Sequence, residues 1–122
     1  MILRNIIAVG LGGAVGAIMR YGMTLLGSLL QWSGNMPTFL VNVLGSFLIG
    51  LLTACCEQGT WLLLLTVGMC GGFTTFSTFS VQSLTLIQQG KWSGAILYIA
   101  GTVLVCILMA WLGSVIGQKI RM

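Results

Sequence analysis

The chain has 122 residues, of which 57% are hydrophobic and only 5% are charged. Soluble domains carry about 25% charged residues, so five basic residues and one acid cannot cover a water-soluble protein of this length, and the excess apolar surface requires lipid as its solvent. The net charge of +4 is also too dispersed for the clustered phosphate contacts of nucleic-acid binding.

Charged residues divide the chain into four apolar stretches. Each is at least about as long as the 20 residues that a helix needs to cross a bilayer. The predicted spans are residues 5–30, 36–56, 60–88 and 92–118. The tryptophans Trp32, Trp61 and Trp92 lie near the predicted interfaces, where this residue is common. We therefore expect residues 1–122 to form one all-α, four-helix transmembrane domain, and no cleavable signal peptide, because the first stretch is too long for one.

The orientation in the membrane is weakly specified. Arg4, Lys119 and Arg121 lie on one side, whereas Lys91 lies on the other and Arg20 lies inside the first span. The positive-inside rule then gives only a slight preference for internal termini. Two interpretations remain open: a fixed orientation, or insertion in both orientations to give an antiparallel pair.

The first and last spans carry signals for close helix packing. Gly12 and Gly16 form a GxxxG pair, as do Gly113 and Gly117. Small residues let helix backbones approach in lipid, where hydrophobicity does not drive helices together. We expect both pairs at helix–helix contacts.

The second span contains one strongly polar side chain, Asn42. A carboxamide buried in lipid needs partners, and its NH2 group offers two donors. Asn42 is predicted either to bond a neighbouring helix or to donate hydrogen bonds into an ion pathway.

The third span contains the sequence GGFTTFSTFS at residues 71–80. Two glycines followed by two β-branched threonines make a poor helix centre, so we predict a break near residues 71–75, in the middle of the membrane. Backbone groups freed at that depth are tolerated only where protein, water or an ion satisfies them. Freed carbonyls suit a hard cation, whereas amides at a helix N-terminus suit an anion.

Phe76 and Phe79 follow the predicted break with a spacing that places them on one helix face. Hydroxyl groups surround them, from Thr75, Ser77, Thr78 and Ser80. The pattern fits a packed aromatic pair, or a pore wall in which ring edges and hydroxyls replace the water around a small anion without the tight binding of a full charge.

In the fourth span, Tyr98, Thr102 and Cys106 share one face. They form a polar track or bond back to their own helix. The other cysteines are Cys55, Cys56 and Cys70, and no CxxC spacing occurs, so all four are interpreted as buried small apolar residues.

Three segments together resemble the Fluc family of bacterial fluoride channels, also called CrcB proteins. They are GGAVGAIMRY at 12–21, TFLVNVLG at 38–45 and GGFTTFSTF at 71–79. They lie in three of the four spans and in order, and the last is the most specific.

The resemblance implies an antiparallel homodimer of dual-topology subunits in the bacterial inner (cytoplasmic) membrane, with two pores that export fluoride passively. It implies a structural sodium ion (Na+) at the dimer centre, bound by main-chain carbonyls of Gly71 and Thr74 from each subunit. It places Phe76 and Phe79 in the pore wall with Asn42 as a nearby donor. The other implied pore residues are Ser77 and Thr78, with Thr38, Tyr98, Thr102 and Arg20 along a polar track or vestibule.

Two residues depart from the family pattern: Pro37 precedes Thr38 where glycine is common, and Cys106 takes the place of an expected hydroxyl. The main alternative is a small dual-topology multidrug exporter. Such proton-coupled exporters need a carboxylate within the membrane, and the one acid, Glu57, lies at the end of a span. A glycine-packed accessory subunit would not explain the broken helix. An enzyme is not expected, because a chain with no histidine and one carboxylate has almost no group for general acid–base chemistry.

Overall fold

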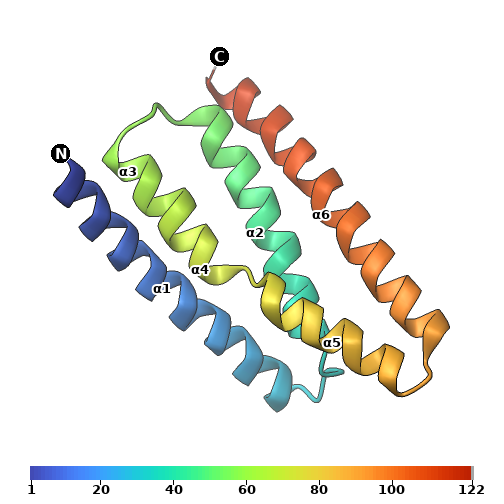
Figure 1. Cartoon of the computed structure of the whole chain (residues 1–122). Coiled ribbons are helices and arrows are strands. Elements are labelled where there is room, and N and C mark those ends of the chain that lie inside the picture. Colours follow the sequence, from blue (N-terminus) through green and yellow to red (C-terminus); the bar gives the residue numbers. More distant parts are fainter. Residues whose placement is uncertain (122) are drawn as a thin grey trace.

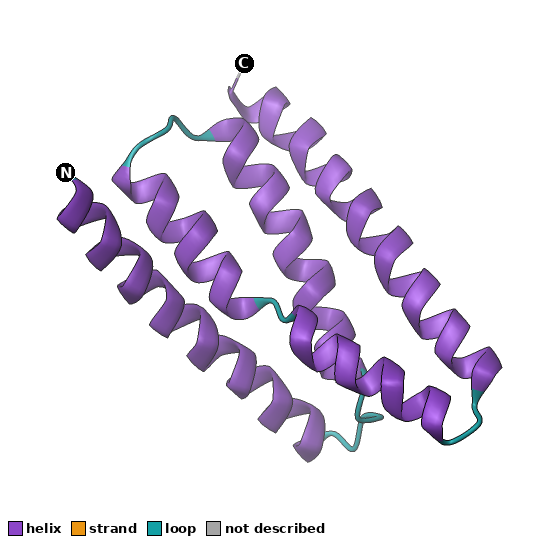
Figure 2. Cartoon of the chain, viewed as in Figure 1, coloured by secondary structure: helices purple, strands orange, loops and turns teal. Residues whose placement is uncertain are grey.

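The protein consists of helices joined by short turns throughout residues 1–121, the part of the chain that this computed structural model describes (Figures 1 and 2). The elements are α1 (Ile2–Leu29), α2 (Met36–Cys55), α3 (Thr60–Leu63), the π-helix η1 (Leu64–Cys70), α4 (Gly71–Phe73), α5 (Phe76–Gln88) and α6 (Trp92–Arg121). Four stretches are long and apolar enough to cross a membrane: Ile2–Leu29, Met36–Cys55, Thr60–Gln88 and Trp92–Arg121. Their ends lie within about one helical turn of the predicted ends.

The helix ends have local causes. Pro37 lies in the first turn of α2, where its missing N–H costs nothing. Gly90 ends α5 in a left-handed conformation, with φ of 74°, and the next amide, on Lys91, donates to the Leu86 carbonyl at 2.9 Å. The basic side chains of Lys119 and Arg121 lie in the last turn of α6, where the helix dipole favours positive charge.

The helices pack in two pairs. One pair is α2 with α6, and the other is α1 with the stretch formed by α3, η1 and α4. The helix α5 leaves this second pair and contacts α6 and α2. In Figure 1, both chain ends lie at the same end of the bundle as the α2–α3 turn.

Both predicted glycine pairs lie at these contacts, which confirms the packing prediction. A methyl group on Gly12 would overlap the Leu64 carbonyl, and one on Gly16 would overlap the Met69 carbonyl. Likewise, Gly113 and Gly117 of α6 abut the backbone of α2. The backbones therefore approach too closely for any larger side chain.

The third stretch is irregular along its length. It begins as an α-helix, widens into η1 and narrows again into α4. Gly71 and Gly72 keep helical geometry, whereas Thr74 and Thr75 are extended, with φ and ψ of −84° and 160° and of −150° and 113°. A methyl group on Gly72 would meet the Gly13 backbone, with its nearest atom 2.5 Å away, so this glycine serves packing against α1.

Large apolar side chains cover much of the outer surface. On α6, Leu104, Ile107 and Trp111 are all more than half exposed. Soluble monomers rarely expose contiguous apolar patches of such extent. This surface is suited to lipid or to another membrane-embedded chain.

Candidate functional site

Asn42 of α2 bonds both polar groups of one residue between α4 and α5. Its Nδ2 donates to the Thr75 carbonyl at 3.1 Å, and its Oδ1 accepts from the Thr75 amide at 2.8 Å. The carboxamide thus pairs with the main chain of Thr75 much as a neighbouring strand would. One N–H of the Asn42 side chain is left for a further partner.

Thr75 also caps α5. Its Oγ1 accepts from the Thr78 amide at 3.1 Å, as an N-cap hydroxyl does. The same oxygen contacts the Ser77 and Thr78 hydroxyls at 3.2 and 3.1 Å. Three hydroxyls therefore form one cluster at the positive end of the α5 dipole.

These bonds leave carbonyl oxygens free. The Gly71 carbonyl would normally accept from the Thr75 amide, which is bonded to Asn42 instead. The Thr74 carbonyl would accept from the Thr78 amide, which is bonded to the Thr75 hydroxyl. Within residues 1–121, neither carbonyl has a hydrogen-bond donor. Two main-chain oxygens are thus available to a ligand, and a hard cation is the ligand they suit.

The Gly72 carbonyl, one of the two between them, accepts a hydrogen bond from a side chain. Arg20 of α1 donates from Nε to the Gly72 oxygen at 3.1 Å. The guanidinium lies beside a cavity of about 30 Å³ that Thr38 and Thr78 also line. Arg20 therefore joins α1 to the end of α4, and its charge lies near the hydroxyl cluster.

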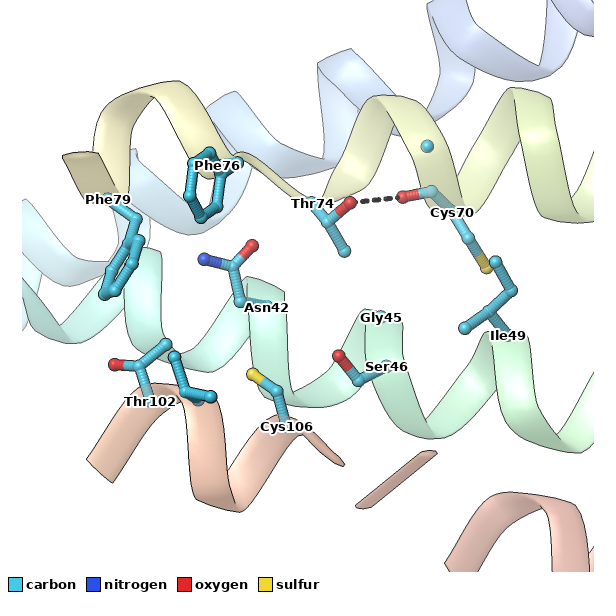
Figure 3. Close-up of a pocket in the computed structure, with 12 residues that line it drawn as sticks. Asn42, Gly45, Ser46, Ile49, Cys70, Thr74, Phe76, Phe79, Thr102 and Cys106 are labelled. Carbon is cyan, nitrogen blue, oxygen red and sulfur yellow. Dashed lines mark hydrogen bonds between the residues drawn. The ribbon is translucent and has the colours of Figure 1, made fainter. Parts of the chain in front are cut away.

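A second cavity, of about 290 Å³ and named the large cavity in contrast to the small one beside Arg20, lies between α2, the α4–α5 junction and α6 (Figure 3). Its lining residues are Asn42, Gly45, Ser46, Ile49, Cys70, Gly71, Thr74, Phe76, Phe79, Thr102, Val103 and Cys106. None of these residues, all in the described part of the chain, carries a charge. The wall combines amide, hydroxyl, thiol and aromatic groups, so it can bind an ion only weakly.

Two aromatic rings form one end of the wall. The Phe76 and Phe79 ring centroids lie 5.6 Å apart with planes at 49°, and Phe79 contacts Tyr98 at 5.3 Å and 51°. Tilted rings present their positive edges to a neighbour. The Phe79 side chain is 6% exposed, whereas that of Phe76 is 76% exposed, so Phe76 marks an open side of the cavity.

Thr102 of α6 has a hydroxyl with no partner. Six other hydroxyls donate to the carbonyl four residues earlier in the chain: those of Thr24, Thr66, Thr74, Ser80, Ser83 and Thr85. The Thr102 oxygen makes no such bond, although the residue is 5% exposed and lines the cavity. An unbonded hydroxyl in a buried position is costly unless a ligand or water reaches it.

The structure brings only some of the predicted site residues together. Asn42, Gly71, Thr74, Phe76, Phe79 and Thr102 line the large cavity. Arg20, Thr38 and Thr78 line the small one, and Ser77 joins the hydroxyl cluster. Tyr98 lies with Thr102 along a third cavity of about 330 Å³ and donates from its hydroxyl to Gln82 Oε1 at 2.7 Å.

Several residues of the site were not among those predicted. Ser46 and Cys70 line the large cavity, and Gln82 bonds Tyr98. The capping role of Thr75 had a local signal, a threonine just before a helix start. The others had none, because their places depend on how distant helices pack.

The fold and site define a small all-helical membrane protein with an uncharged polar cavity beside freed main-chain carbonyls. Residues 7–114 match the family described as CrcB-like protein, Camphor Resistance (CrcB), and the chain belongs to this family. It is 44% identical over 120 residues to a protein of Magnetococcus marinus named fluoride-specific ion channel FluC, across 92% of this chain and 96% of the relative.

Two further relatives are similar along nearly their whole length. A fluoride-specific ion channel FluC of Ruminiclostridium cellulolyticum is 42% identical, across 95% of this chain and 94% of its own. Fluoride-specific ion channel FluC 1 of Listeria monocytogenes is 38% identical, across 94% and 98%. The likeness therefore covers all four membrane-spanning stretches.

Proposed function

We propose that this protein is a fluoride-specific ion channel that lets fluoride leave the cytoplasm passively across the cytoplasmic membrane. It is a channel and not an enzyme. The observation that carries the proposal is the uncharged cavity lined by Asn42, Phe76, Phe79 and Thr102. Its donors and ring edges can replace part of the hydration shell of a small anion, and the lack of a cation in its wall keeps the ion mobile.

A second copy of the chain completes the channel. Phe76 lines the cavity yet is 76% exposed, which supports a partner subunit on that side. The small difference in positive charge between the two ends of the bundle supports partners of opposite orientation. An antiparallel homodimer then contains two equivalent fluoride pores, one for each set of phenylalanines.

The extended residues Thr74 and Thr75 interrupt the third span in the middle of the membrane. They lie halfway along the stretch Thr60–Gln88, which supports this depth. Their backbone groups are accommodated because Asn42 satisfies Thr75 and because the remaining oxygens face an ion.

The ion at the dimer centre is a structural sodium ion that is not transported. The free Gly71 and Thr74 carbonyls fit such an ion in donor type, since hard cations bind oxygen. Two subunits supply four of these oxygens around the symmetry axis. An experimental density map of the dimer should contain an oxygen-coordinated cation there, and density for an anion would contradict the assignment.

The test is fluoride efflux from liposomes that contain the purified protein and potassium fluoride. With a potassium ionophore present, rapid fluoride release is expected, and chloride release should be far slower. Phe79→Ile should reduce fluoride release while the protein still elutes as a folded species, because an aliphatic side chain has no ring edge to offer. Equal release of both anions, or no release, contradicts the proposed function.

A further inference from the structure

We infer that Cys55 and Cys56 form a chelating dithiol site for trivalent arsenicals at the end of α2. Their Sγ atoms lie 3.5 Å apart. This site lies outside the large cavity and does not rest on the proposed channel function.

The local backbone brings the two thiols together. Cys55 is the last residue of α2, and Cys56 is extended, with φ of −107° and ψ of 147°. This change of direction places both sulfurs on one side, whereas successive residues of a regular helix point in directions about 100° apart. The Cys56 amide still donates to the Leu52 carbonyl at 3.0 Å, so the turn is anchored to the helix.

The thiols are accessible at an edge of the bundle. Both residues are partly exposed, and Glu57, Gln58 and Gly59 after them are exposed. The α2–α3 turn that they begin lies at the same end of the bundle as the two termini (Figure 1). Of the four cysteines, only Cys70 is buried, which corrects the prediction that all four are buried apolar residues.

The sulfur separation selects the kind of ion. Sulfur bonds to a metal centre of zinc-like size at about 2.3 Å, so sulfurs 3.5 Å apart subtend roughly 100° at a shared centre. That angle suits pyramidal trivalent arsenic. A linear two-coordinate ion would need the sulfurs about 4.6 Å apart. A tetrahedral ion would need two further ligands, and the described residues contain no group of three or more His, Cys, Asp or Glu side chains that could hold a metal.

Binding of a trivalent arsenical to the two thiols requires no oxidant or reductant. An organoarsenic(III) oxide reacts with two thiols: two S–H bonds and the arsenic–oxygen bond break, two As–S bonds form, and the oxygen leaves as water with both protons. The hydrogen bond with Cys55 raises the pKa of the Cys56 thiol. Condensation with an arsenic oxide uses the protonated thiols, whereas a cation such as Zn²⁺ must displace the protons.

Phenylarsine oxide provides the test, with intact mass as the readout on the full-length protein. We expect one phenylarsenic adduct per subunit that survives an excess of a monothiol and is removed by a small dithiol. Cys55→Ser and Cys56→Ser should each abolish the monothiol-resistant adduct. Cys106→Ser, which changes a partly exposed cysteine elsewhere, should retain it.

Two results would overturn the site: no stable adduct on the unchanged protein, or an adduct that persists in both serine variants. Size-exclusion chromatography identifies a misfolded variant, in which case the other serine variant decides. Because the readout is mass and not ion flux, failure here leaves the efflux test of the channel unaffected.

Discussion

At the residue scale, the Thr102 hydroxyl is a group that should matter for ion conduction but not for the stability of the fold. Thr102 is almost completely buried and lacks a partner, while comparable hydroxyls on α5 bond their own helix. A buried donor without a partner costs about 1–3 kcal/mol. Retaining such a group makes physical sense if it donates to an ion that passes through the cavity, since hydrogen bonds to charged groups are worth about 1.5–3 kcal/mol.

Thr102→Val should therefore move stability and conduction in opposite directions. Valine keeps the shape of threonine and removes the hydroxyl, so the free energy of unfolding should stay the same or rise by up to about 1–3 kcal/mol. Fluoride efflux should fall about tenfold or more, since a factor of ten corresponds to about 1.4 kcal/mol. Thermal unfolding and liposome efflux are measured on the same preparation.

Ser83→Ala is the matched control, because the Ser83 hydroxyl donates to the Phe79 carbonyl at 2.8 Å and lines none of the cavities described above. It should change efflux little. A Thr102→Val protein with normal efflux would remove this hydroxyl from the pathway. A protein with reduced efflux and reduced stability would point to a packing role instead.

At the element scale, α1 and the third stretch fit together because both lack side chains where they meet. A methyl group on Gly16 would overlap the Met69 carbonyl and lie 2.8 Å from the Phe73 amide nitrogen. Backbone atoms cannot rotate away as a side chain can. The position of α4, and with it the free Gly71 carbonyl, thus depends on the absence of one methyl group on α1.

Gly16→Ala should consequently destabilise the protein by about 1–3 kcal/mol, the usual cost of overpacking. Gly22→Ala is the control on the same helix. Nothing lies within 4 Å of a methyl group at Gly22, so the higher helix propensity of alanine should leave stability equal or slightly raised. Thermal unfolding in detergent compares the two variants. Equal stability of both would show that the α1 contact is looser than these distances indicate.

The positions of the helices in the sequence were largely predictable, whereas the side-chain hydrogen bonds between the helices were not. Long uncharged stretches predicted where spans begin and end, because lipid permits few charges there. The pairing of Asn42 with Thr75 joins residues 33 positions apart and has no local signature. The same holds for the Arg20 bond to Gly72 and for the widened turns of η1.

The third span shows most clearly how far local helix propensity can predict the course of the backbone. The two glycines and the two threonines together were predicted to break the helix near residues 71–75. Gly71 and Gly72 are helical, and the extended residues are Thr74 and Thr75. Helix propensity is a weak preference that tertiary contacts override. Here the Asn42 carboxamide takes the Thr75 amide and carbonyl, which fixes where the helical hydrogen bonds stop.

At the scale of the whole molecule, orientation depends on very few charges. The end that carries the termini holds Arg4, Lys119 and Arg121, and the opposite end holds Lys91. Lysine and arginine in short loops set the orientation of a membrane protein. With so small a difference, shifting a few positive charges to one end should fix all copies in one direction, and an antiparallel dimer could then no longer form from a single variant.

Two oppositely biased variants test this directly. Ser33→Lys and Asn35→Lys with Lys119→Ser and Arg121→Ser leave three positive residues at the Lys91 end and only Arg4 at the opposite end. Gln58→Lys with Lys91→Ser leaves four positive residues at the end that holds the termini and none at the Lys91 end. Each variant expressed alone should give little fluoride efflux, because its copies share one orientation. Co-expression should restore efflux, since the two orientations then pair. The lysines replace turn residues outside the membrane-spanning helices, so loss of folding is not expected. Full efflux from either variant alone would argue for a channel built from subunits of one orientation.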